Sequence, residues 1–122
     1  MIKALIADSD LDSHELVDDI LQINFRYVKI DRALNATSFL NKIKDAQPPY
    51  NLILFNPEID INGELKLLDQ IRALNPQMLN HIILLNADID QFRESESGIM
   101  FAIKKPFSLD YFSEVIKKAC AS

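Results

Sequence analysis

The stretch Tyr50-Asn51-Leu52-Ile53-Leu54-Phe55-Asn56-Pro57 decides the fold of this chain. Its central residues, 52–55, are all apolar, and they lie between the pair Pro48-Pro49 and an Asn-Pro pair. A short apolar run between turn signals is typical of a strand buried on both faces, as in the centre of a parallel sheet. Ligand-binding and reactive side chains commonly follow the carboxyl ends of such strands. The side chain at that position here is Asn56.

Four further apolar segments are predicted as strands, at 2–7, 27–30, 81–85 and 99–103. A segment with helical spacing of apolar residues follows each strand, and the segment 88–97 is the weakest of them. Asp12 or Ser13, Asn35 and Ser108 are the expected N-caps, and the helix after the central strand is expected to start at Glu64. The expected buried faces comprise Leu16, Val17, Ile20 and Leu21; Phe39, Leu40 and Ile43; Leu65, Leu68 and Ile71; and Leu109, Phe112, Ile116 and Ala119.

Five alternations of strand and helix predict an α/β fold, with a five-stranded parallel sheet covered by helices on both faces. The chain has 122 residues and contains no repeat, linker or low-complexity segment. This length suits one compact domain with a substantial core. We therefore expect a single, stand-alone domain over residues 1–122.

Composition argues against several functional classes. A net charge of −5, with no basic cluster, disfavours nucleic acid and anionic membranes as partners. The single cysteine, Cys120, excludes an internal disulfide, and the two histidines have no metal-ligand spacing. The N-terminus leads directly into an apolar strand, and no segment resembles a signal peptide or a membrane span. We expect a cytoplasmic protein.

Polar residues stand at the ends of the predicted strands: Asp8, Ser9 and Asp10, then Asn56, Asn86 and Lys105. In a doubly wound sheet these ends meet at one edge. Polar side chains also follow buried strands simply because the chain meets water there, so each residue alone carries little information. The set together is more specific, because it defines one candidate pocket.

The whole chain resembles the receiver domain of two-component response regulators (CheY-like, flavodoxin-like). The resemblance rests on Asp8-Ser9-Asp10, on the strand that ends at Asn56, on Asn86-Ala87 and above all on Lys105-Pro106-Phe107. It implies a phosphoacceptor aspartate after the central strand, and two acids after the first strand that hold Mg²⁺. It also implies a hydroxyl after the fourth strand and a lysine after the fifth that bind the phosphoryl group.

The chain departs from that pattern at most of these positions. Asn56 stands at the acceptor position, and an amide is not a nucleophile that can form an acyl phosphate. Ser9 stands in place of the second acid and Asn86 in place of the hydroxyl residue. Only Asp8 and Lys105 therefore have the residue type that the family's pattern calls for. The family's switch aromatic would stand at Ala102. The resemblance thus predicts a degenerate pseudo-receiver in which Asn86 and Ala102 occupy the switch positions.

One clear carboxylate is a poor site for Mg²⁺, which prefers several acidic oxygen ligands. We expect no cofactor, and a weak Mg²⁺ site at Asp8 and Asp10 only if metal binding persists at all. Lys105 should then pair with Asp8 or with the amide oxygen of Asn56. The resemblance also implies a cis bond between Lys105 and Pro106. No nucleophile–base pair is visible, so we do not expect an enzyme.

The leading functional hypothesis is a phosphorylation-independent signalling domain that acts through protein contacts. A histidine kinase or another signalling protein is the expected partner, with a homodimer through the last helix as a further candidate. Two alternatives remain: a phosphorelay receiver with a non-standard acceptor among Asp10, Glu58 and Asp60, and a small-ligand or nucleotide-binding module. The second lacks a glycine-rich phosphate loop. The expected contact residues are Asp90, Phe92, Arg93, Phe101, Tyr111 and Lys117.

Overall fold

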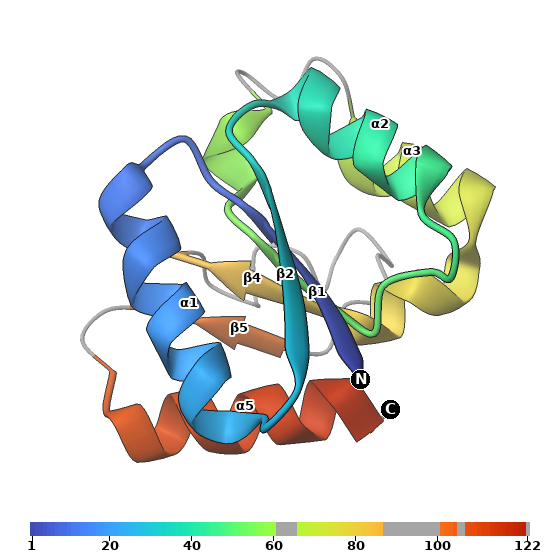
Figure 1. Cartoon of the computed structure of the whole chain (residues 1–122). Coiled ribbons are helices and arrows are strands. Elements are labelled where there is room, and N and C mark those ends of the chain that lie inside the picture. Colours follow the sequence, from blue (N-terminus) through green and yellow to red (C-terminus); the bar gives the residue numbers. More distant parts are fainter. Residues whose placement is uncertain (61–65, 87–100, 105–106, 122) are drawn as a thin grey trace.

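The computed structural model describes residues 1–60, 66–86, 101–104 and 107–121 (Figure 1). The described strands form one parallel sheet in the order β2-β1-β3-β4-β5, which places β3 at its centre. The predicted α/β fold is therefore confirmed, and β2 lies at one edge of the sheet. The strands are β1 Ile2–Ala7, β2 Val28–Ala33, β3 Leu52–Phe55, β4 Ile82–Leu85 and β5 Phe101–Ile103.

Helices cover both faces of the sheet (Figure 1). The helices α1 and α5 pack on one face, and α2 and α3 pack on the other. Two short 3₁₀ helices, Pro57–Ile59 and Pro76–His81, follow β3 and precede β4. Among the described residues, none of the helices is both long enough and apolar enough to span a bilayer. The α-helices are α1 Leu11–Asn24, α2 Ala36–Asp45, α3 Leu67–Leu74 and α5 Leu109–Ala121.

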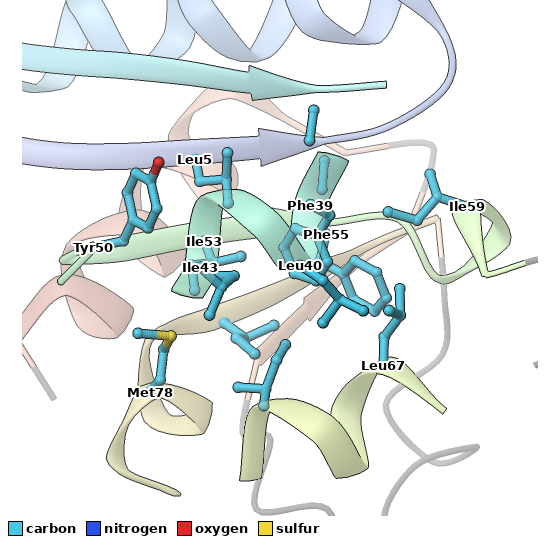
Figure 2. Close-up of a cluster of buried hydrophobic side chains, with 14 of the residues drawn as sticks. Leu5, Phe39, Leu40, Ile43, Tyr50, Ile53, Phe55, Ile59, Leu67 and Met78 are labelled. Atoms are coloured by element: carbon cyan, nitrogen blue, oxygen red, sulfur yellow. The ribbon is translucent and has the colours of Figure 1, made fainter. Parts of the chain in front are cut away.

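The central strand β3 contributes to both hydrophobic cores, because successive side chains of a strand point to opposite faces. Ile53 and Phe55 belong to the cluster under α2 and α3, whereas Leu52 and Leu54 belong to the cluster under α1 and α5. Figure 2 shows the first cluster, in which the ring of Phe55 stacks on that of Phe39 with 5.1 Å between centroids. Burial on both faces explains why residues 52–55 form one continuous apolar run.

Several details of the predicted helices are wrong. Leu16, which was expected to be buried, is 44% exposed, and His14 lies on the buried face of α1 instead. The buried residues of α1 are His14, Val17, Ile20 and Leu21, which recur at helical spacing, and Leu16 lies outside that stripe. In α5, Leu109 is exposed and Val115 is buried instead. Helix α3 begins at Leu67, and the expected helix at 88–97 lies outside the described residues.

Candidate functional site

The candidate pocket lies where β1 and β3 end side by side. Asp8 follows β1 and Asn56 follows β3, and the two strands are direct neighbours in the sheet. Backbone hydrogen bonds hold both residues in register. The backbone N–H of Asp8 donates to the Ala33 carbonyl at 3.1 Å, and the backbone N–H of Asn56 donates to the Ala7 carbonyl at 2.8 Å. The sheet thus places these two side chains together, as the sequence predicted.

Asp8 is a buried carboxylate with only 1% of its surface exposed. Its Oδ1 accepts a hydrogen bond from the backbone N–H of Asp10 at 2.9 Å. Its Oδ2 accepts a long bond, 3.4 Å, from the side-chain amide nitrogen of Asn56. A buried carboxylate requires such donors, because burial without them is costly.

Asn56 links the end of β3 to both neighbouring segments. It is 5% exposed, and its Nδ2 donates to Asp8 while its Oδ1 accepts from the Glu58 backbone N–H at 3.0 Å. The second bond also caps the 3₁₀ helix that begins at Pro57. Both ends of the amide are therefore engaged within the described chain. We refer to this pair of bonds, from Asp8 through Asn56 to Glu58, as the amide bridge.

Asp10 serves the helix rather than the pocket. It is the N-cap of α1, where its carboxylate accepts from the Asp12 N–H at 2.9 Å and from the Ser13 hydroxyl at 3.3 Å. The prediction that Asp12 or Ser13 would cap this helix is wrong. Asp10 is the N-cap because the chain is still extended at this residue, which is the backbone geometry of an N-cap. Ser9 is exposed beside it.

Asn86 ends β4 in the left-handed conformation, with φ of 57°. Asparagine tolerates this region better than most residues other than glycine. Its backbone N–H donates to the Ile103 carbonyl at 2.9 Å, which joins the ends of β4 and β5. Asn86 therefore has a structural role at the position where the resemblance implies a hydroxyl.

A buried histidine beneath the pocket was not among the predicted site residues. His14 is 0% exposed, and its Nε2 lies 2.7 Å from the backbone carbonyl oxygen of Asp8. Within the described part of the chain, its Nδ1 has no hydrogen-bond partner. The spacing of His14, Val17 and Leu21 on one helical stripe is the signal that could have identified it. A carbonyl oxygen can only accept, so Nε2 is the donor of this hydrogen bond.

The other two carboxylates considered as non-standard acceptors, Glu58 and Asp60, are not directed into the pocket by any hydrogen bond of the described residues. The Oδ2 of Asp60 accepts from the Leu67 N–H at 3.2 Å, at the start of α3. Glu58 is exposed, and its backbone rather than its carboxylate contacts Asn56. Among the described residues, no three His, Cys, Asp or Glu side chains are grouped as a metal site would require. Burial raises the pKa of the half-buried Cys120 thiol, which disfavours the reactive thiolate.

The expected contact face is described only in part. Tyr111 is 50% exposed and Lys117 is also exposed, both on α5. Phe101, another expected contact residue, is not exposed: it is half-buried, because its side chain packs against the cluster under α1 and α5. Its neighbour Ala102 packs on the opposite face of the sheet. Asp90, Phe92, Arg93, Lys105 and the Lys105–Pro106 bond lie outside the described residues.

Among known proteins, this chain is similar in fold to a set of solved structures. No family model matches the chain, and no curated protein matches it. Solved structures do match along nearly the whole chain. A response regulator receiver domain protein from Clostridium thermocellum superposes with a TM-score of 0.79 at 17% identity, covering 99% of this chain and 95% of its own. A CheY-like receiver domain protein from Methanospirillum hungatei JF-1 gives 0.78 at 22% identity, covering 99% and 94%.

A putative pilus assembly protein from Burkholderia thailandensis E264 has the same fold. Its TM-score is 0.74 at 14% identity, and each chain is covered in full, at 100%. The chain described here thus has the fold of response regulator receiver domains. Proteins with different names share that fold, so the role of this chain must be argued from its own residues.

Proposed function

We propose that this chain is a receiver-like signalling domain that acts through protein contacts, without phosphorylation at the end of β3. The observation that carries the proposal is the amide bridge. Asn56 stands at the end of the central buried strand, and both its amide groups are hydrogen-bonded inside the chain. A phosphoacceptor at this position would need a free carboxylate oxygen directed outward to attack the donor.

The same geometry disfavours a divalent cation. The Nδ2–H of Asn56 is directed at Asp8 Oδ2, the oxygen that a cation in this pocket would otherwise use. Mg²⁺ loses its waters reluctantly and requires several oxygen ligands in octahedral geometry. Asp10 is committed to capping α1. We therefore propose that the pocket holds no tightly bound Mg²⁺ and that the domain performs no catalysis of its own.

The proposed partner is a protein of a two-component or related signalling system, such as a histidine kinase. The described part of α5 offers Tyr111 and Lys117 on its exposed side. A half-exposed tyrosine combines apolar area with a hydroxyl group, which suits protein interfaces. A pair of domains related by a two-fold axis through α5 is the alternative use of this face.

Phosphotransfer chemistry gives the direct test. The wild-type protein, incubated with acetyl phosphate and Mg²⁺, should show no stable mass gain by intact-mass spectrometry. The doubly substituted variant Ser9→Asp/Asn56→Asp should gain one phosphoryl group if Asn56 and Ser9 are what disable the pocket. A wild-type mass gain that disappears on substitution of Asp8, Asp10, Glu58 or Asp60 would overturn the proposal.

Partner capture provides the second half of the test. Wild-type protein and the Asn56→Asp variant should retain the same partner proteins, with and without acetyl phosphate. The variant Tyr111→Ala should retain less of them, while Asp19→Ala on α1 serves as the exposed control. Capture that requires phosphorylation would contradict a contact mode independent of it.

A further inference from the structure

A polar groove that is largely open to solvent lies away from the amide bridge, between strand β2 and helix α2. Its volume is about 750 Å³, within the range of about 300–1,000 Å³ that is usual for small-molecule sites. Neither Asp8 nor Asn56 lines it. The side chains that matter below are Lys3, Asp31, Asn41, Lys42, Asp45 and Tyr50. We call this cavity the β2–α2 groove.

Tyr50 anchors the floor of the groove. Its side chain is 5% exposed, and its hydroxyl donates to Asp31 Oδ2 at 2.7 Å. Figure 2 places Tyr50 at one end of the hydrophobic cluster, away from Ile59, with its hydroxyl directed toward the neighbouring strands. Burial and the neighbouring carboxylate raise the pKa of Tyr50, so the phenol remains a donor. The orientation of the Asp31 carboxylate is therefore fixed before any ligand arrives.

Asp31 has no cationic partner among the residues that the structure describes. Within the described chain no Lys, Arg or His lies within ion-pair distance of it, and its one side-chain hydrogen bond comes from Tyr50. The nearby Lys3 ammonium donates instead to the Pro48 carbonyl at 2.8 Å and lies 4.9 Å from the centroid of the Tyr50 ring. A half-buried carboxylate without a counter-charge is well placed to receive a cation from a ligand.

The α2 wall of the groove supplies the opposite charge. Lys42 is half-buried, and no acidic side chain of the described part pairs with it. Its four-carbon stem lets the ammonium reach a ligand over several ångströms. Asn41 adds amide groups one residue away. Lys3 and Lys42 balance Asp31 and Asp45, so the charged lining is neutral overall and does not favour polyanions such as nucleotides.

We propose that the β2–α2 groove binds a small zwitterion of the amino-acid type. The ligand's ammonium would contact Asp31 and its carboxylate would contact Lys42, so that each unpaired charge of the groove receives a partner. The amide of Asn41 and the hydroxyls of Thr37 and Ser38 would meet a polar side chain. This site is independent of the proposed signalling function and does not require the amide bridge.

NMR titration of the whole chain with individual amino acids tests the proposal. A polar amino acid such as glutamine should give saturable shifts at the backbone amides of Asp31, Asn41 and Lys42, with a Kd of about 1 mM or tighter. Two blocked derivatives serve as controls: the N-acetyl form lacks the ammonium, and the α-carboxamide lacks the carboxylate. Each should bind at least about ten-fold more weakly, because each loses a charged contact.

Variants localise the binding. Asp31→Asn and Lys42→Gln should each weaken it about ten-fold, and Tyr50→Phe should weaken it less, because the carboxylate loses its fixed orientation but keeps its charge. Asp19→Asn, an exposed acid on α1, should leave the Kd unchanged. The proposal is overturned if no standard amino acid gives saturable shifts in the groove. The proposal is also overturned if the blocked derivatives bind as tightly as the free amino acid, or if Asp31→Asn and Lys42→Gln both bind it as tightly as the wild type.

Discussion

At the scale of single residues, the amide group of Asn56 determines what the pocket can do. An aspartate would have nearly the same shape, but it would bring a second negative charge next to the buried Asp8. The amide instead supplies a donor to Asp8 Oδ2 and an acceptor for the Glu58 N–H. One nitrogen in place of one oxygen thus changes a repulsive contact into a hydrogen bond.

The substitution Asn56→Asp should lower the free energy of unfolding by about 1–3 kcal/mol in metal-free buffer, because Asp8 loses a donor and gains a like charge. The loss should shrink in acid, where one of the carboxyl groups takes up a proton, and with millimolar Mg²⁺. Urea denaturation with EDTA and with Mg²⁺ measures both effects. Asn41→Asp, at an exposed position of α2, is the matched control. Equal stability of wild type and Asn56→Asp with EDTA would show that the amide bridge is not stabilising.

Asn86 provides a second residue-scale prediction, based on its φ of 57°. Replacement by Thr restores the hydroxyl of the receiver pattern but forces a β-branched residue into the left-handed region, at a cost of about 1–2 kcal/mol. Replacement by Gly should be neutral or slightly stabilising at the same position. Thermal unfolding of the two variants side by side distinguishes the backbone effect from the side-chain effect. A fully stable Asn86→Thr protein would contradict the assigned conformation.

The Tyr50–Asp31 hydrogen bond should appear in the pH dependence of stability. The pKa of Tyr50 is raised in the folded state, so its contribution is fully present below the ordinary phenol pKa of about 10. Above that pH the unfolded chain ionises first, and stability is lost as the pH rises further. The wild type should therefore lose more stability than Tyr50→Phe above about pH 10. Parallel curves for the two proteins would show that this bond is not maintained.

At the scale of elements, side-chain caps determine where the helices begin. Asp10 caps α1 through the Asp12 N–H, and Asn35 caps α2 through the Ser38 N–H at 2.8 Å. Substituting either residue by Ala should cost about 1 kcal/mol, because a backbone donor of the first turn loses its partner. Asp19→Ala, in the exposed middle of α1, should remain within about 0.5 kcal/mol of wild type. Urea unfolding of the three variants would test this, and an Asp10→Ala cost no larger than that of Asp19→Ala would contradict the capping role.

At the scale of the whole molecule, the sheet joins two hydrophobic cores. Ile71 of α3 is fully buried on one face, and Ile116 of α5 is fully buried on the other. Each Ile→Val substitution should cost about 0.5–1.5 kcal/mol. The double variant should unfold in a single transition with costs that add within about 0.5 kcal/mol, because the two side chains lie in separate hydrophobic clusters on opposite faces of the sheet. Calorimetry that resolves two transitions would show that the faces unfold separately.

The sequence by itself determined the fold class, the central position of residues 52–55 and the chemical character of the pocket. These follow from local patterns: a strand buried on both faces must be continuously apolar, and the end of such a strand must be polar. The amide at position 56 is visible in the sequence because it is a matter of functional group and not of shape.

Only the tertiary structure decided how these residues are partnered. Sequence could not show that Asn56 donates to Asp8, that Asp10 caps α1, or that His14 is buried beneath the pocket, because each depends on contacts between separate elements or on the rotation of a helix about its axis. The same holds for the β2–α2 groove, whose charged residues come from β1, β2 and α2. Periodicity predicts which elements form, whereas packing decides which of their polar groups meet.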